Sequence, residues 1–436
     1  MLRRSAWQAR FPAFESADFR RLFWNSFFAW AASWTLILAN GWLVFELSHS
    51  AAAVGGVTFA GMVPFALAGP IGGVVADRVD RRRLAIYAAA ISIAVSLGLA
   101  ALALSGVVQV WHVVLLAVVN GVARAGGSPA QDALLPNVLA RREHLLNGVA
   151  LIGISRFGSR LAGPLFGTLL LSSLGAGYVF VLSAGMVALS LWQLSLIEYR
   201  QPASAVPAAA GGVTETLRSA GRDLADGFRY VERDQRVLLT LVLVMLHCGL
   251  TMAFDSMMPT LATMVGGASQ AFGAILVGIG VGAIAGTVAL SMVTNAAVRG
   301  SVLAVTGVGS GLSMLVLGFA FTPAMAVAGA VLAGAAQGAY MALVAAFLQQ
   351  IVPDALRGRV LSINMMLAAG HMGFMNFGFG WLADGVGVRL LLIGPGLLWT
   401  ALFIASCFVM PEMRHLLRRG DFRPRVLAAE RVPAEA

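Results

Sequence analysis

The amino-acid sequence predicts an all-α membrane protein in which twelve transmembrane helices form two pseudo-symmetric six-helix bundles. Apolar stretches of about 20 residues recur along the chain, and each is long enough to cross a hydrocarbon core of roughly 30 Å. Only 11% of the 436 residues are charged, whereas soluble domains carry about 25%. Too few charges therefore remain to cover the protein in water, and lipid must surround much of its surface.

The apolar stretches are expected to be helices, because a lone segment in lipid satisfies its backbone hydrogen bonds internally only as a helix. Short polar connections separate most of the stretches. The twelve expected spans are 22–46, 52–76, 84–105, 110–131, 146–171, 177–197, 237–261, 271–293, 301–321, 323–350, 359–383 and 388–410.

The polar segments divide the chain into five parts. No short apolar core with a small-residue cleavage site opens the sequence, so the first part is expected to be a lead-in rather than a signal peptide. The central loop is expected to carry an amphipathic helix at 214–233, and the charged tail is expected to lack order. The parts are the lead-in 1–21, the first bundle 22–197, the central loop 198–236, the second bundle 237–410 and the tail 411–436.

Arginine placement predicts the orientation in the membrane. With both termini inside, 26 of the 30 arginines fall in cytoplasmic segments, three lie within spans and only Arg389 faces outward. An excess of basic residues in cytoplasmic loops is the known bias of membrane insertion. The sequence therefore predicts a multi-pass protein of a bacterial inner membrane with cytoplasmic N- and C-termini.

A faint internal repeat relates the two bundles. Pro136 is followed by Asn147 after 11 residues, and Pro353 is followed by Asn364 after 11 residues, at an offset of 217 between halves. The same offset takes Gly163 to Gly380. Two six-helix halves related by an axis normal to the membrane are one transporter architecture.

The loop after the second span carries a recognisable motif. Residues 72–83 read GGVVADRVDRRR, which resembles motif A of the major facilitator superfamily, a Gly-x-x-x-Asp-Arg-x-x-Arg-Arg pattern between the second and third helices. The resemblance implies that Asp77 lies at the N-terminus of the eleventh span, where the helix dipole favours an anion. It also implies that Arg81 or Arg78 pairs with Asp132. The gating residues implied are Gly73, Asp77, Arg78, Arg81, Arg82, Asp132, Arg357 and Arg359. The alternative is that the arginines only hold the loop inside.

Other loops narrow the resemblance to one branch of the superfamily. Asp80 stands where many members have Gly, and residues 352–360 and 129–136 are similar to enterobactin-type siderophore exporters and macrolide-efflux proteins. The resemblance covers roughly residues 15–410. It implies a secondary active transporter, a proton-driven exporter of a siderophore-like or anionic aromatic molecule by alternating access. The alternatives are a multidrug or macrolide efflux pump, an importer, and a non-transporting membrane sensor or lipid-handling scaffold.

The fifth and fourth spans add two further comparisons with the superfamily. Gly163, Pro164 and Gly167 resemble the Gly-Pro-x-x-Gly core of motif C, which is associated with export, although Ser159 replaces a glycine of the fuller motif. The proline permits a bend and the glycines permit close packing, so a packing role alone is the alternative. The arginine of motif B would fall near Ala117 and is absent, which argues against proton antiport.

Polar residues inside the spans are the candidates for substrate binding and ion coupling, since they are costly in lipid and usually face a cavity or each other. Three cations against one acid predict a positive cavity and an anionic or polyhydroxy-aromatic substrate. Asp255 is the candidate for proton coupling. The alternatives are structural pairing of the arginines and simple hydrogen bonding of the histidines. The candidates are Arg124, Arg156, Arg160, Asp255, His247, His371, Asn120 and Gln337.

The sequence argues against an enzyme. It contains no lysine, so the phosphate-loop motif that ends in Lys-Ser/Thr is excluded. No hydrolase triad or metal-ligand spacing occurs among the six histidines and few acids, and both cysteines, Cys248 and Cys407, lie in apolar runs. We therefore expect no cofactor, no metal and no nucleic acid. The expected partners are a small-molecule substrate, membrane lipids and protons, and the expected oligomeric state is a monomer.

Overall fold

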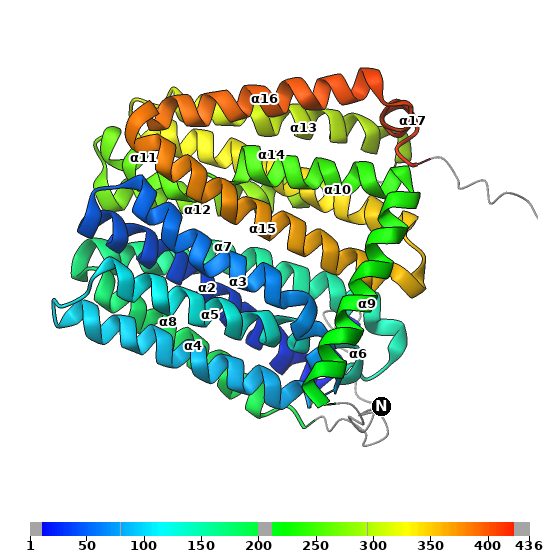
Figure 1. Ribbon diagram of the computed structural model, residues 1–436, viewed down its shortest axis with the longest axis horizontal. Coiled ribbons are helices and arrows are strands. Elements are labelled where there is room, and N and C mark those ends of the chain that lie inside the picture. The colour runs from blue at the N-terminus through cyan, green and yellow to red at the C-terminus, as the bar shows by residue number, and fades with distance from the viewer. Residues whose placement is uncertain (1–10, 79, 199–211, 294, 423–436) are drawn as a thin grey trace, which may run out of the picture.

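Long helices dominate the structure, a computed structural model that describes residues 11–78, 80–198, 212–293 and 295–422. Within these ranges no β-strand occurs, and twelve long helical segments run side by side (Figure 1), as the sequence predicts. Ten of them are apolar enough, by length and composition, to cross a membrane. Large apolar side chains cover the outside, such as Val305 and Phe408, which are 71% and 74% exposed. Lipid is the solvent that favours such a surface.

The first bundle lies in the chain before residue 198. Its first long helix is preceded by a 3₁₀ turn at Pro12–Glu15, and the short helix α6 (Leu135–Val138) links two others. The long helices are α2 (Ala17–Ser48), α3 (Ala51–Arg78), α4 (Arg81–Leu104), α5 (Val110–Asp132), α7 (Leu145–Leu174) and α8 (Ala176–Ser195).

The second bundle begins after α9 (Gly212–Arg233), the amphipathic helix expected in the central loop. Its first long segment is broken rather than continuous over 237–261. The other helices are α12 (Ala268–Ser291), α13 (Ala296–Gly318), α14 (Pro323–Ile351), α15 (Asp354–Val386) and α16 (Val388–Val409). A short helix, α17 (Pro411–Arg419), follows in the tail, which the sequence led us to expect to be without order. It forms because it packs against α13, where the backbone of Leu417 lies beside Gly300.

Local sequence determines where several helices begin and end. The Ser16 side chain accepts a hydrogen bond from the Phe19 N–H at the start of α2, and Asp80 accepts one from Arg83 at the start of α4. These are N-caps, which satisfy backbone donors that the helix leaves unpaired. Gly175 and Gly387, at φ values of +88° and +95°, make the tight turns that close α7 and α15.

The broken segment consists of α10 (Gln235–His247), a π turn (Cys248–Met252), a 3₁₀ turn (Asp255–Met257) and α11 (Met258–Met264). Neighbouring helices pair with two backbone groups at the break: Gln337 donates to the Thr251 carbonyl at 2.6 Å, and Asn376 accepts from the Ser256 N–H at 3.1 Å. A hydropathy pattern reports apolar length only, so the break was not expected from it.

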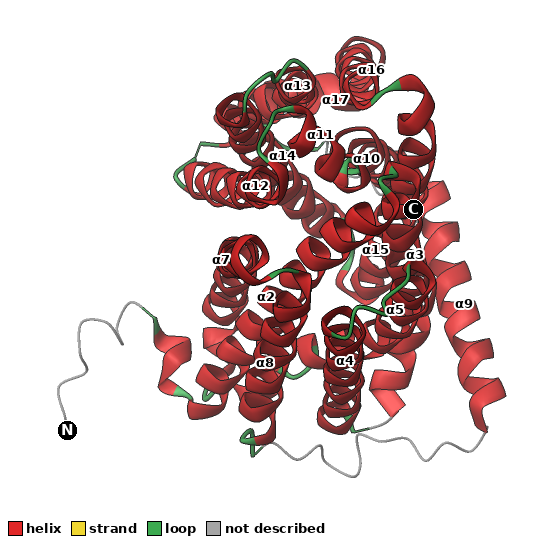
Figure 2. Ribbon diagram, turned by 90° about the vertical axis from the view of Figure 1, so that its left-hand side faces the viewer, coloured by secondary structure: helices red, strands yellow, loops and turns green. Residues whose placement is uncertain are grey.

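The two bundles meet at α3 and α15, and again at α7 and α12. Figure 2 looks along the helices and shows the bundles as two groups with α3 and α15 adjacent between them. Glycines allow the contact: a Cβ on Gly55 would lie 2.6 Å from the Asn376 carbonyl oxygen, and one on Gly380 would lie 2.5 Å from the Ala51 carbonyl oxygen. Helices in membranes approach most closely where their side chains are small.

The two ends of the molecule are packed differently. We call the end that carries the 3₁₀ turn at Pro12–Glu15 and helix α17 the terminal end, and the other the opposite end. At the opposite end one apolar cluster includes residues of both bundles, for example Phe45, Val54 and Phe272. At the terminal end the buried clusters belong to one bundle each over the described residues. The opposite end is therefore sealed by a shared core, and the terminal end is not.

Candidate functional site

A cavity of about 1060 Å³ lies between the two bundles. Helices α2, α3 and α5 supply most of its wall, and Asp255 and Ala369 come from the second bundle. The wall combines aromatic and apolar side chains with a few polar groups, the usual composition of a small-molecule site. Its aromatic and polar lining residues are Trp30, Trp34, Phe65, Ser33, Asn40, Thr58, Asn120, Arg124 and Asp255.

Arg124 is the cation of this wall. Its guanidinium lies 5.7 Å from the Trp30 ring and 5.5 Å from the Phe65 ring, on the faces of both. It makes no hydrogen bond or ion pair with any residue that the structure describes. Aromatic faces stabilise a cation in part, but all of its N–H donors remain available.

Asp255 is the acid of the same cavity, and it lies on the 3₁₀ turn after the break in the seventh segment. The break is what turns this side chain toward the first bundle. Its carboxylate interacts electrostatically with Arg160 of α7, but no hydrogen bond or ion pair joins them. The two opposite charges therefore belong to different bundles and are close enough to interact without forming an ion pair.

Arg160 lies beside the central cavity. Its guanidinium is 4.7 Å from the ring of Trp34, a cavity residue, and its backbone carbonyl packs against Gly280 of α12. Residues Gly163, Pro164 and Gly167 continue α7 from here. A Cβ on Gly163 would lie 2.5 Å from the Ala31 carbonyl oxygen, so this motif holds α7 against α2.

Arg156 does not line the central cavity. It pairs with Asp132, and both line a separate hollow of about 730 Å³ within the first bundle. Asp132 thus has a partner other than the Arg81 or Arg78 that the motif resemblance implies, because the long side chain of Arg156 reaches it from α7. Arg81 donates to the adjacent Ala133 carbonyl at 3.1 Å.

The two intramembrane histidines and Gln337 do not line the central cavity. His247 is 0% exposed and stacks on Tyr340, with ring centroids 4.3 Å apart. Neither of its ring nitrogens has a hydrogen-bond partner among the described residues. Gln337 donates its amide hydrogen bond to the Thr251 carbonyl of the π turn, and His371 packs against Gly249 of the same turn. His247 therefore lies in the core of the second bundle and does not line the central cavity.

The gating residues expected from motif A fall in two groups. The side chains of Gly73, Asp77 and Arg78 lie outside the described residues. Arg82 donates to the carbonyls of Leu194, at 3.3 Å, and Ser195, so it anchors α4 to α8 within one bundle.

Helix α15 carries the remaining gating residues. Arg359 lies 3.7 Å from Asp226 of α9, and Arg357 is half-buried. Helix α9 also contacts α3, so it lies across the terminal end against both bundles (Figure 1).

An acid at the opposite end was missed from the sequence. Asp384, near the end of α15, accepts hydrogen bonds from the Ser50 hydroxyl at 2.5 Å and from the Ala51 and Ala52 N–H groups at 3.0 and 3.4 Å. It thereby caps the N-terminus of α3 from the other bundle. Two features of the sequence could have indicated this contact: an acid, Asp384, at the end of one apolar span, and a serine, Ser50, directly before another span.

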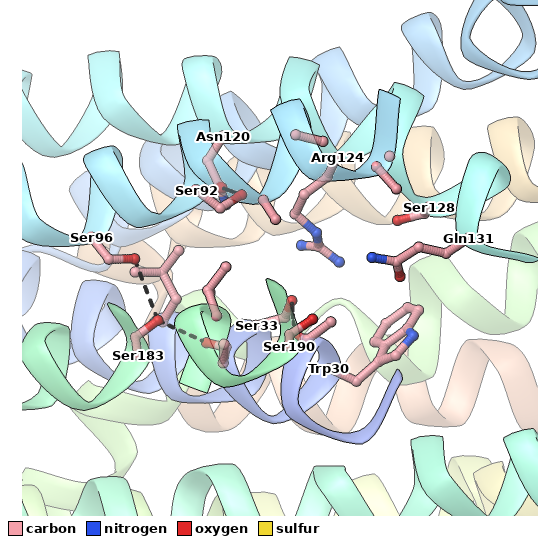
Figure 3. Close-up of a pocket in the computed structure, with 18 residues that line it drawn as sticks. Trp30, Ser33, Ser92, Ser96, Asn120, Arg124, Ser128, Gln131, Ser183 and Ser190 are labelled. Atoms are coloured by element: carbon pink, nitrogen blue, oxygen red, sulfur yellow. Dashed lines mark hydrogen bonds between the residues drawn. The ribbon is translucent and has the colours of Figure 1, made fainter. Parts of the chain in front are cut away.

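A second pocket missed from the sequence lies inside the first bundle, between α2, α4, α5 and α8 (Figure 3). Its volume is about 620 Å³. The third and sixth spans carry no charge, and so no site was expected from them; their serines supply much of the wall. The polar lining residues are Ser33, Ser92, Ser96, Asn120, Arg124, Ser128, Gln131, Ser183 and Ser190.

Two helical bundles around a central cavity, inside an apolar exterior, define a multi-pass membrane transporter of the major facilitator type. The chain belongs to the transmembrane secretion effector family, whose model matches residues 8–431. Solved structures agree on the fold. A D-xylose–proton symporter superposes with a TM-score of 0.69 at 17% identity over 92% of this chain and 98% of that one. The nucleoside transporter NupG gives 0.69 at 14% identity over 89% and 99%.

Sequence relatives add a functional comparison. The multidrug efflux pump Tap of Mycolicibacterium fortuitum is 25% identical over 396 residues, which cover 89% of this chain and 94% of that protein. Tap of Mycobacterium tuberculosis (strain ATCC 25618 / H37Rv) is 28% identical over 218 residues, about half of each chain. These relatives are transporters rather than enzymes, and none is named as a siderophore exporter.

Proposed function

We propose that the protein is a secondary active exporter that moves a small organic molecule through the bacterial inner membrane by alternating access. The observation that carries the proposal is the central cavity, which is sealed at the opposite end by a core that both bundles share. The terminal end, with its arginines, faces the cytoplasm. Substrate enters from that end, and rocking of the bundles then exposes it to the other side.

The proposed substrate is an aromatic molecule with an anionic or polyhydroxy group. Trp30, Trp34 and Phe65 offer flat apolar faces, and the available N–H groups of Arg124 offer charge-assisted hydrogen bonds. The siderophore-like substrate class fits this chemistry. A catechol ring stacks on the aromatic faces, and its oxygens accept hydrogen bonds.

The second candidate function is multidrug efflux of hydrophobic cations. The similarity to Tap over 94% of that protein supports it, and Asp255 is a carboxylate in the cavity without a hydrogen-bond partner among the described residues. A cation on Asp255 would compete with the interaction between Asp255 and Arg160. The two candidates therefore rely on different charged residues of one cavity, Arg124 and Asp255.

Protons are the proposed coupling ion, with Asp255 as the carrier. The carboxylate faces Arg160 from the other bundle, so its charge strengthens the attraction between bundles and its protonation weakens it. A group placed at that boundary can link proton binding to rocking. The absent motif B arginine near Ala117 means that any coupling must use such a different residue.

Efflux assays test both candidates with dyes of opposite charge. Cells that express the protein are loaded with carboxyfluorescein, an anionic aromatic dye, or with ethidium, a cationic one. The favoured function predicts carboxyfluorescein export that falls roughly tenfold or more in Arg124→Gln, because hydrogen bonds to a charged group are lost. Export of ethidium rather than carboxyfluorescein would support the second candidate. Loss of export in Asp255→Asn is expected for either dye, because Asp255 is also the proposed proton carrier.

Matched controls separate these effects from general damage. Arg389→Gln removes another arginine that lies on an aromatic ring, 4.2 Å from Phe321, outside the cavity. Glu46→Gln removes an exposed acid near the opposite end. Both should export normally, and a protonophore should stop export in every active variant. Export of neither dye, with protein present in the membrane, would contradict the proposal for these substrate classes.

A further inference from the structure

The serine-lined pocket inside the first bundle has a composition of its own. Eight of its lining side chains are serine, asparagine or glutamine, and none is aspartate or glutamate. Its one charged lining residue is Arg124, which also lines the central cavity. The pocket and the cavity therefore share a wall at this guanidinium.

Several hydrogen-bond donors of this pocket have no acceptor among the described residues. Some hydroxyls are used internally: Ser92 donates to the Asn120 side-chain oxygen at 2.8 Å, and Ser33 donates to the Ala29 carbonyl at 3.0 Å. Since the Asn120 oxygen is the acceptor, its amide N–H groups point elsewhere. The side chains of Arg124, Ser128 and Gln131 make no hydrogen bond with any described residue.

These free donors converge. Positions 124, 128 and 131 are separated by four and three residues on α5, so they form one stripe of the helix. Figure 3 shows Arg124, Ser128 and Gln131 pointing into the same space, with Trp30 on its other side. A group bound there would be met by a guanidinium, a hydroxyl and an amide together.

The charges around the pocket favour an anion. Neither acid of the neighbouring hollows pairs with Arg124: Asp132 pairs with Arg156, and Asp255 makes no hydrogen bond or ion pair with any described residue. A half-buried guanidinium without a counter-charge is costly, and an anion that accepts several charge-assisted hydrogen bonds reduces that cost. A cation would be repelled by Arg124 and would find only neutral oxygens.

We propose that this pocket is a binding site for a small anion, which Arg124 binds together with Ser128, Gln131 and the amide of Asn120. The ligand chemistry is a halide, a phosphate or a carboxylate group. Its source is either a free inorganic anion or the anionic group of an aromatic molecule whose body occupies the central cavity. The second source rests on the proposed function, and the first does not.

Thermal unfolding of the purified full-length protein tests the proposal without a transport assay. The midpoint is measured in chloride or phosphate against gluconate at equal ionic strength, and in benzoate against the neutral benzamide. A ligand that binds only the folded state raises the midpoint in a saturable manner. A rise in chloride or phosphate identifies a free anion, and a rise in benzoate alone identifies an aromatic acid.

Variants then assign the rise to the pocket. Arg124→Gln should abolish it, and Ser128→Ala should weaken the apparent affinity about tenfold, because a hydrogen bond to a charged ligand is lost. Arg389→Gln and Ser172→Ala, matched changes outside the pocket, should keep it. Arg124→Lys, which retains the charge, covers the case in which the glutamine variant does not fold.

Two results would overturn the proposal. One is a midpoint that no anion raises in the wild type. The other is a rise that persists undiminished in Arg124→Gln and Ser128→Ala, which would show anion binding at surface arginines instead. Because the readout is binding, a failure here leaves export untouched, and a failure of export leaves the anion site untouched.

Discussion

The carboxylate of Asp384, near the end of α15, accepts a hydrogen bond from the N–H of Ala51, the first residue of α3, at 3.0 Å. The two residues belong to different bundles, so this contact joins the halves at the opposite end. The N-terminus of a helix carries unpaired N–H groups and a partial positive charge, which a carboxylate stabilises. Opening of that end must break the contact, and we therefore expect Asp384 to act as a latch.

The latch predicts the effect of Asp384→Asn. The amide keeps the size of the side chain and one acceptor oxygen but loses the charge, and a charge at an exposed helix N-terminus contributes about 0.3–1 kcal/mol. The open state at the opposite end should become up to roughly fivefold more populated. Labelling of a cysteine placed in the cavity, by an impermeant maleimide added from that side, measures the change. The matched variant Glu46→Gln should label as the wild type does, and equal labelling of both variants would exclude a latch.

The seal between α3 and α15 predicts a contrast between adjacent glycines. A Cβ on Gly55 would lie 2.6 Å from the Asn376 carbonyl oxygen, whereas one on Gly56 would meet nothing within 4 Å. Gly55→Ala should therefore force the bundles apart at a cost of about 1–3 kcal/mol. Thermal unfolding and dye export measured side by side should show a loss for Gly55→Ala and little change for Gly56→Ala. Similar behaviour of the two variants would mean that the close approach is not needed.

The ion pair of Arg156 and Asp132 predicts a small effect on stability. Both side chains are partly exposed, at 35% and 52%, and such pairs contribute only about 0–1 kcal/mol. Arg156→Gln should therefore unfold within about 1 kcal/mol of the wild type and should export better than Arg124→Gln. The exchange of the two residues, Arg156→Asp with Asp132→Arg, should restore any loss. A larger export defect in Arg156→Gln than in Arg124→Gln would contradict the account, because it would mean that the substrate binds in the hollow lined by Arg156 and Asp132 and not in the central cavity.

We predict that His247 can be replaced by phenylalanine without loss of transport. Its ring is fully buried against Tyr340 and Trp399, and its nitrogens have no partner among the described residues. An unsatisfied buried polar group costs about 1–3 kcal/mol, so His247→Phe should be neutral or stabilising. Thermal unfolding and export are measured for this variant. Tyr340→Phe, which removes the hydroxyl of the stacked neighbour, is measured in parallel. Lost export at unchanged stability would show that His247 carries protons after all.

The helical layout follows from the sequence because lipid leaves few choices. Apolar runs long enough to cross a membrane mark each span, and the helices extend beyond them at both ends, as α2 does from Ala17 to Ser48. Position 214–233 is amphipathic and forms α9 as expected. The break at Cys248–Met252 depends on Gln337 and His371 from other helices, so hydropathy carries no trace of it.

The candidate site is predictable only in part, because a sequence shows which residues are costly in lipid but not what they face. Arg124 and Asp255 were identified by cost alone, and both line the cavity. The same reasoning selected His247, which is fully buried and lines neither the central cavity nor the serine-lined pocket. Neutral serines such as Ser92 and Ser183 add little free-energy cost to a membrane helix, since a serine can hydrogen-bond to the backbone of its own turn. The pocket they form appears only when four helices are brought together.

Alternating access of one central cavity is the claim on which the proposed function depends. Thr58 lines that cavity, and a cysteine there, in a chain with Cys248 and Cys407 replaced, can be labelled by an impermeant maleimide in vesicles of either orientation. We predict labelling from the terminal end in the resting protein, and from the opposite end once Asp384→Asn releases the latch. Labelling from both ends at once, or from neither in any state, would contradict the account.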